Sequence, residues 1–110
     1  MMRTHTCGEL TAKNIGERVV LCGWLDSKRN HGGILFLIIR DLYGITQAII
    51  EPSNKNFVIA ENLTNETVIK ITGVVRKRPI GNENKNIPTG EIEVLLEELE
   101  ILTEAKQPPF

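Results

Sequence analysis

The sequence of 110 residues has little aromatic content, few cysteines and almost no excess of charge. Aromatic residues make up 5% of the chain, which argues against a binding groove built from many stacking rings. With a net charge of −1, the whole molecule is not attracted to nucleic acid or to a membrane surface, so any polyanion site must be a local patch. No apolar run is long enough to span a bilayer, and residues 1–10 lack the hydrophobic segment of a signal peptide.

The two cysteines, Cys7 and Cys22, are isolated and form no disulfide framework. Such usage is typical of the reducing cytoplasm, where we expect the protein to work. His5, Cys7, Cys22 and His31 contain no pair with the spacing of zinc ligands, so we predict no metal site. The chain also lacks a glycine-rich phosphate loop and the order of a Ser-His-Asp triad, so no catalytic residues are expected within it.

What the sequence does contain is a series of short stretches rich in Val and Ile, separated by turn residues. These stretches predict strands at 18–25, 34–41, 45–51, 67–78 and 91–102. The segment 51–63 breaks the series, because Pro52 and Ser53 form a helix-start signal and the apolar residues after them recur at roughly helical spacing. We therefore expect a short helix between the third and fourth strands, and a helical turn within 7–16.

Five strands with a helix between the third and fourth correspond to an all-β OB fold, a five-stranded Greek-key barrel. Alternation in the fourth strand places apolar residues such as Ile69 and Ile71 on one face and basic residues on the other. In the last strand the apolar parity changes after Glu97–Glu98, which predicts a bulge or a bend. Residues 1–105 are predicted to form the domain, and the Pro-Pro sequence within 106–110 to begin a linker.

Four stretches carry a family resemblance: MRTHTCGEL, LCGWLDSKRNHGG, RDLYGITQ and RKRPIGNENKNIPTGEIEV. Through them the chain resembles, over essentially its full length, the N-terminal anticodon-binding domain of bacterial aspartyl-tRNA synthetases. The resemblance implies that residues 1–105 bind tRNA(Asp) and that 106–110 lead to a catalytic domain beyond Phe110. It also implies a homodimeric class II parent enzyme, an aspartate–tRNA ligase that uses ATP and Mg²⁺, with no cofactor in this segment.

Three residues can recognise bases, although each also has an ordinary structural explanation. Phe36 can stack on a base or fill the core, and composition alone weights the two equally. The amide of Gln47 suits the edge of uracil, but sequence alone favours a solvent-facing strand residue. The carboxylate of Glu93 can accept the amine of cytosine, or it can be an exposed strand glutamate. The resemblance assigns Phe36 and Gln47 to the middle anticodon base, a uracil, and Glu93 to the third, a cytosine.

A local positive rim is predicted from basic residues before the glycine turn and at the end of the fourth strand. Its members are Arg29, Arg76, Arg78, Lys28 and Lys77. Arginine binds phosphate with two hydrogen bonds or stacks on a base; the alternative is solubilising charge, which we favour for the two lysines. The resemblance places the three arginines at the anticodon loop and Asn82 near the first anticodon base, guanine or queuine. Arg40 and Asp41 are expected to pair with each other and fix a hairpin.

Two further residues bear on specificity, and a third departs from the family pattern. His31 and Gly81 match synthetases that charge both tRNA(Asp) and tRNA(Asn), which leads to the hypothesis of a non-discriminating enzyme; the alternative is that His31 is an ordinary loop residue. Ile38 stands where family members carry an acidic residue, which makes the exposed face more apolar. The alternative function is a sequence-tolerant module that binds single-stranded nucleic acid, although low aromatic content and a net charge near zero argue against it.

Overall fold

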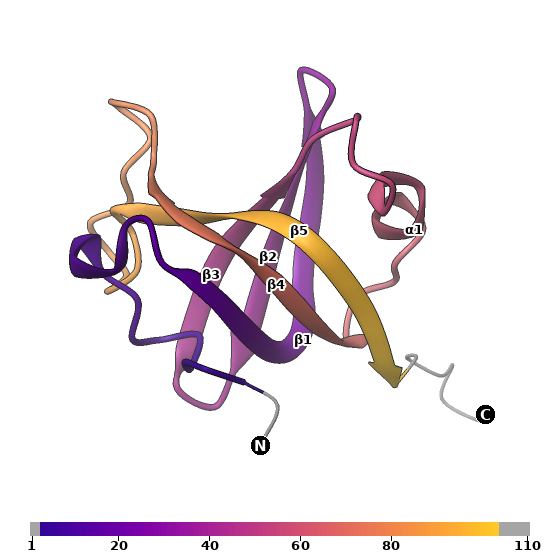
Figure 1. Ribbon diagram of the computed structural model, residues 1–110, viewed down its shortest axis with the longest axis horizontal. Coiled ribbons are helices and arrows are strands. Elements are labelled where there is room, and N and C mark those ends of the chain that lie inside the picture. Colours follow the sequence, from indigo (N-terminus) through magenta and orange to yellow (C-terminus); the bar gives the residue numbers. More distant parts are fainter. Residues whose placement is uncertain (1–2, 104–110) are drawn as a thin grey trace.

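The computed structural model describes residues 3–103, which form five strands, a short α-helix and a 3-10 helix (Figure 1). In chain order the elements are η1 (Ala12–Asn14), β1 (Arg18–His31), β2 (Ile34–Asp41), β3 (Gly44–Ile50), α1 (Phe57–Glu61), β4 (Val68–Lys77) and β5 (Ile92–Thr103). All five predicted strands are present. The first extends six residues beyond its predicted end at position 25, because β1 continues out of the barrel as one arm of a hairpin with β2.

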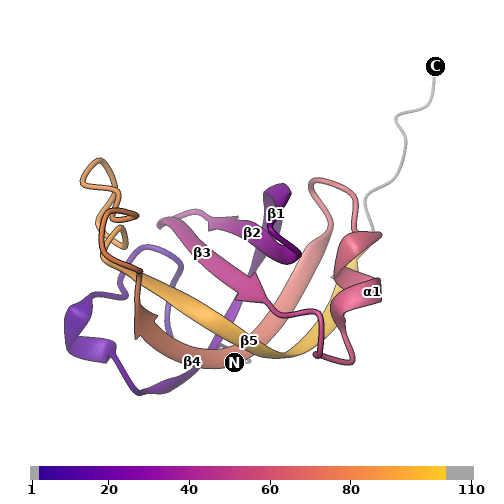
Figure 2. The ribbon, with the colours of Figure 1, turned by 90° about the horizontal axis from the view of Figure 1, so that it is seen from above.

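The strands close into a barrel in the order β1-β2-β3-β5-β4. Neighbouring strands are antiparallel except β3 and β5, which run parallel with Ala48 opposite Val94. With α1 placed between β3 and β4, this topology is the OB fold predicted from the sequence. Figure 2 shows α1 beside the C-terminal end of β5, at the end of the barrel opposite the loop 79–90.

A bulge at Asp26 divides β1 into two parts. Leu25 is opposite Ile39 of β2, but Ser27 is opposite Ile38, so Asp26 is an extra residue in the ladder. Before the bulge the odd-numbered residues of β1, such as Leu21, face the core. After it, odd-numbered residues lie on the outer face instead, because a shift of one residue exchanges the two faces of a strand.

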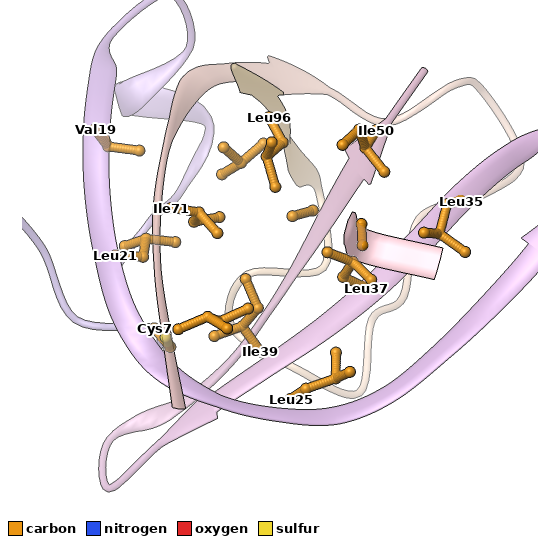
Figure 3. Packing of buried hydrophobic residues seen from close by; sticks show 14 of the residues in the cluster. Cys7, Val19, Leu21, Leu25, Leu35, Leu37, Ile39, Ile50, Ile71 and Leu96 are labelled. Atoms are coloured by element: carbon orange, nitrogen blue, oxygen red, sulfur yellow. The ribbon is translucent and has the colours of Figure 1, made fainter. Parts of the chain in front are cut away.

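The core consists of aliphatic side chains directed into the barrel (Figure 3). Its members include Val19, Leu21, Leu25, Leu35, Leu37, Ile39, Ile50, Ile71 and Leu96. The predicted alternation of β4 is confirmed, since Ile69, Ile71 and Val75 are buried while Lys70 and Arg76 are half-exposed. The aromatic ring of Phe57 packs against this cluster, whereas Phe36 does not belong to it.

The bulge predicted in the last strand is also present. Thr72 of β4 is opposite Glu98 and Gly73 is opposite Leu96, which leaves Glu97 as the extra residue. Beyond this point Leu99 packs against the core. The change of apolar parity in the sequence therefore correctly predicted an irregularity in the pairing of β4 with β5.

Both helices lie where the sequence predicts them, but the predicted first residue of the second one is not the observed one. The helical turn expected within 7–16 is η1, which Thr11 caps by accepting a hydrogen bond from the Lys13 amide. The start signal at Pro52 and Ser53 was wrong, because α1 begins at Phe57. Residues 106–110, predicted to begin a linker, lie outside the described residues.

The predicted pairing of Arg40 with Asp41 is wrong, since each bonds elsewhere. Arg40 Nε donates to Asp26 Oδ1 at 3.1 Å, across the hairpin of β1 and β2. The Asp41 carboxylate accepts hydrogen bonds from the amides of Cys7, Tyr43 and Gly44. Asp41 thus does fix the β2–β3 turn, but through backbone amides, which also tether the N-terminal segment to this end of the barrel.

Candidate nucleic-acid interface

A cavity of about 330 Å³ opens between the β1–β2 hairpin and the loop 79–90. Figure 1 shows both segments projecting from the same side of the barrel. The cavity, here called the loop hollow, is lined by Arg29, His31, Phe36, Gln47, Arg78, Asn82 and Asn84. Six of these seven residues were predicted from the sequence, and the fold brings them together from four separate segments. Asn84 was missed, because nothing distinguished it from the other polar residues of a loop expected to be a flexible turn.

The ring of Phe36 lies half-buried on the outer face of β2 and not in the core. The guanidinium carbon of Arg29, the residue opposite it on β1, lies 5.3 Å from the ring centroid. The imidazole of His31 meets the ring edge-on, with centroids 6.5 Å apart and an interplanar angle of 72°. Of the two explanations for Phe36, core filling is therefore excluded, and the ring forms part of the surface of the hollow.

Gln47, which lines the hollow with Phe36, and Glu93 form a hydrogen-bonded network with two arginines. Gln47 Nε2 donates to Glu93 Oε1 at 3.1 Å, and Arg78 Nη1 donates to Gln47 Oε1 at 3.4 Å. Arg76 Nε donates to Glu93 Oε2 at 2.8 Å. The amide of Gln47 is thus held at both ends, which fixes its orientation before any ligand arrives.

The alternative that Glu93 is an ordinary exposed strand residue is wrong, since it is only 2% exposed. Its side chain points out of the barrel, but Gln47 and Arg76 cover it. The burial of its charge is offset by the hydrogen-bonded ion pair with Arg76 and by the hydrogen bond from Gln47. Each carboxylate oxygen has two lone pairs, so both can accept a further donor.

The prediction that Arg78 belongs to an exposed rim is wrong, because this residue is buried and its side chain bonds to the first residue of β5. It is 6% exposed, and Arg78 Nε donates to the Ile92 carbonyl at 2.8 Å. Burial lowers the pKa of the Arg78 guanidinium, and the negative charge of Glu93 opposes that shift. Arg78 Nη2 is buried without a hydrogen-bond partner in residues 3–103. A buried unpaired donor is costly, so this atom is suited to an acceptor supplied by a ligand.

The loop 79–90 is fastened to the barrel at its base. Thr89 Oγ1, which is buried, donates to the Ile45 carbonyl of β3 at 2.6 Å. The Asn84 amide donates to the Gly90 carbonyl, which closes the loop on itself. Gly81 has φ of 91°, a conformation that favours glycine, and its own position is open.

The two lysines of the predicted rim do not approach the loop hollow with their charges. Lys28 Nζ donates to the Glu61 carbonyl at the end of α1. Lys77 lines a separate cavity with Gly81, Glu83 and two further charged residues. The cations that border the hollow are therefore Arg29 and Arg78.

Residues 19–102 match the tRNA anticodon family model, described as an OB-fold nucleic acid binding domain. The chain belongs to this family. An OBody bound to hen egg-white lysozyme has the same fold, with a TM-score of 0.82 at 24% identity, over 97% of this chain and 95% of that one. The barrel therefore also occurs as a separate polypeptide.

The most informative relatives are much longer than this chain. It is 49% identical over 110 residues to the aspartate–tRNA(Asp/Asn) ligase of Thermotoga neapolitana, and 52% over 112 residues to that of Dictyoglomus turgidum. Both alignments cover 100% of this chain and 19% of the relative, so the chain spans about a fifth of their length. The asparaginyl-tRNA synthetase of Pyrococcus horikoshii superposes with a TM-score of 0.81 at 28% identity, over 99% of this chain and 25% of that chain.

The described residues contain neither a metal-binding cluster nor a membrane-spanning helix. Among residues 3–103, no three His, Cys, Asp or Glu side chains gather closely enough to hold a metal ion. In the same range, no helix is long and apolar enough to cross a membrane.

Proposed function

We propose that this chain binds the anticodon of a transfer RNA as part of an aspartate–tRNA ligase. The observation that carries the proposal is the loop hollow, which is lined by the half-exposed Phe36 ring and by the Gln47 amide, already oriented by Glu93 and Arg78. An aromatic face and fixed hydrogen-bonding groups are what a splayed-out base requires. Membership of the tRNA anticodon family supports a tRNA anticodon as the ligand of this site.

Each residue of the hollow has a separate role in the proposal. The middle base, uracil, stacks on Phe36 and bonds to Gln47, whose amide offers both a donor and an acceptor. The third base, cytosine in tRNA(Asp), bonds to Glu93 once part of the cover over that carboxylate opens, since Glu93 is 2% exposed in the unbound chain. Arg78 supplies its unpaired Nη2 to a base or phosphate oxygen, Arg76 holds Glu93, and Asn82 lies by the first base.

The complete enzyme in this proposal has activities that lie outside the chain. Residues 1–105 form the anticodon domain, and 106–110 begin the linker to a catalytic domain. That domain attaches aspartate to tRNA(Asp) with ATP and Mg²⁺, in a homodimer that works in the cytoplasm. The proposal extends to tRNA(Asn), because the relatives named above are Asp/Asn ligases and His31 borders the loop hollow.

The anticodon proposal is tested by titrating the chain with anticodon stem–loops and with unrelated single strands. We expect the stem–loop to bind more tightly, and replacement of its middle uracil to weaken binding. Phe36→Ala should weaken stem–loop binding by about 1–3 kcal/mol, or roughly 5- to 150-fold, because a stacked base loses its platform. Tyr43→Ala is the matched control, since Tyr43 is an exposed ring outside the hollow. Equal affinities for all strands would instead establish a sequence-tolerant binder.

Dual specificity is tested with stem–loops that differ only in the third anticodon base. Cytosine marks tRNA(Asp) and uracil marks tRNA(Asn), and a non-discriminating domain should bind both with comparable affinity. The full-length enzyme should likewise charge both transcripts in an aminoacylation assay. A strong preference for cytosine would end the extension to tRNA(Asn) while leaving anticodon binding intact.

A further inference from the structure

The part of β1 that follows the bulge at Asp26, residues 27–31, is here called the arm. It carries Arg29 and His31, which line the loop hollow beside Phe36. β2 pairs with the arm along one edge, whereas the pairing of β1 with β4 ends at Trp24. Within residues 3–103 the arm is thus an edge strand, and such a segment opens more readily than the centre of a barrel.

Lys28 connects the arm to the short helix α1. Its Nζ donates to the carbonyl of Glu61, the last residue of that helix. The carbonyls of a last helical turn lack partners within the helix, and a lysine satisfies them and the negative end of the helix dipole. The bulge makes this contact possible, because it places Lys28 on the face of the arm opposite Arg29. In an uninterrupted strand Lys28 would lie on the outer face instead.

α1 is a firm anchor because it is itself fixed to the barrel. Ala60 of this helix is fully buried in the core. Asn56 Nδ2, at the helix start, donates to the Glu97 carbonyl of β5 at 3.3 Å. A bond from the arm to this helix therefore fixes where the arm lies, and with it the positions of Arg29 and His31 at the loop hollow.

We propose that Lys28 is a positioning residue for RNA binding, which holds the arm at the loop hollow through α1 and does not itself contact RNA. This inference rests on the anticodon function proposed above. It gives Lys28 a role other than solubilising charge or phosphate binding. An RNA that meets an ordered arm does not bear the entropic cost of ordering it, so the bond to α1 raises affinity.

The test replaces Lys28 by Met, which keeps an unbranched apolar side chain and removes the charged donor. In the chain of 110 residues, Lys28→Met should weaken binding of the anticodon stem–loop by about two- to fivefold, the loss of one exposed charged contact. The slope of log affinity against log salt should keep its wild-type value, whereas loss of a phosphate ligand would lower it by about 0.7. Lys28→Arg retains a donor for the Glu61 carbonyl and should restore the affinity.

Hydrogen exchange of the unbound chain tests the same inference without RNA. Amides of the arm should exchange about two- to fivefold faster in Lys28→Met than in wild type, while those of residues 18–24 keep their rates. Lys55→Met is the matched control, because the Lys55 side chain is 75% exposed and pairs with Glu98 of β5. This control removes the same charge and should change neither exchange in the arm nor stem–loop binding.

Three results would each overturn the role of Lys28 and leave anticodon binding in place. Unchanged exchange in the arm would show that Lys28 does not hold it, and a lower salt slope would show that Lys28 binds phosphate. Wild-type affinity in Lys28→Met would show that the position of the arm does not matter for RNA. If the wild-type chain fails to bind the stem–loop at all, both proposals fall.

Discussion

At the scale of single residues, Arg29 covers the face of Phe36 on which the proposed function stacks a base. Its guanidinium carbon is 5.3 Å from the centroid of the Phe36 ring, too close for a base to lie between them. Binding by stacking on this face therefore requires the arginine to move aside. Once released, a guanidinium next to an RNA backbone can bind phosphate.

Arg29→Ala should therefore have two opposed effects on stem–loop affinity. Loss of one phosphate contact lowers the slope of log affinity against log salt by about 0.7 and weakens binding at low salt. Loss of the cover over Phe36 strengthens binding at every salt concentration. Titrations across a salt series should thus give curves that cross, with the variant binding more tightly than wild type at high salt.

The matched control for this experiment is Arg18→Ala. Arg18 is on the same strand, has a 65% exposed side chain and pairs with Glu97, away from the hollow. Its removal should leave both slope and affinity at their wild-type values. Parallel curves for Arg29→Ala and wild type would show that Arg29 does not cover the stacking face.

At the scale of elements, the loop 79–90 depends on its bond to β3. Thr89→Val keeps the side-chain shape but removes the hydroxyl that donates to the Ile45 carbonyl. The expected cost is about 0.5–1.5 kcal/mol, the contribution of a typical hydrogen bond. Because the bond fastens a loop, hydrogen exchange should accelerate first at the Asn84 and Gly90 amides, whose bonds close that loop.

Thr103→Val, at the exposed end of β5, is the comparison for this variant and should leave exchange in the loop unchanged. Stem–loop binding should weaken for Thr89→Val, since Asn82 and Asn84 border the loop hollow. Uniform acceleration throughout the barrel would contradict a local role for Thr89.

The strands were predictable because alternation and β-branched content report burial directly. The start of α1 was not, because distant contacts override the local signal at Pro52 and Ser53. Asn54 Nδ2 donates to the Leu96 carbonyl and Asn56 Nδ2 to the Glu97 carbonyl, both on β5. These bonds hold the segment in turns until Phe57, and they depend on a strand that lies 40 residues later in the chain.

The candidate site was predictable in its members but not in their exposure. Sequence patterns and family resemblance named Glu93 and Arg78, and both were expected at the surface. Their burial arises because β3, β4 and β5 meet at this point and each contributes a long polar side chain. Such a network depends on the packing of three elements, which no local pattern contains.

At the scale of the whole molecule, Cys7 joins the N-terminal segment to the barrel. Its side chain is fully buried, its amide donates to Asp41, and its carbonyl accepts from Thr46. Burial is the main cause that raises the pKa of the Cys7 thiol, and the negative charge of Asp41 adds to it. The thiol therefore stays protonated in the folded protein under conditions where it ionises in the unfolded chain.

This difference predicts an alkaline loss of stability. An unfolded cysteine has a pKa of about 8.5, so the stabilisation is present below that pH and is lost as the pH rises above it. The contribution of Cys7 falls by about 1.4 kcal/mol per pH unit in that range. Urea unfolding of wild type and Cys7→Ala between pH 8 and 10 should show a shallower decline for the variant. Identical declines would mean that Cys7 ionises equally in both states.

The division of β1 at Asp26 determines how substitutions in the two parts of this strand are expected to act. Residues 18–24 pair with β4, whereas residues 24–31 pair with β2. Trp24 is therefore the residue at which β1 changes its pairing strand. The irregular ladder just after it absorbs any mismatch between the two registers. Under the proposed function, substitutions before Trp24 are therefore expected to act on the folding of the barrel, and substitutions after Asp26 on RNA binding by the arm. Asp26, the extra residue of the ladder, lies between these two parts of one strand.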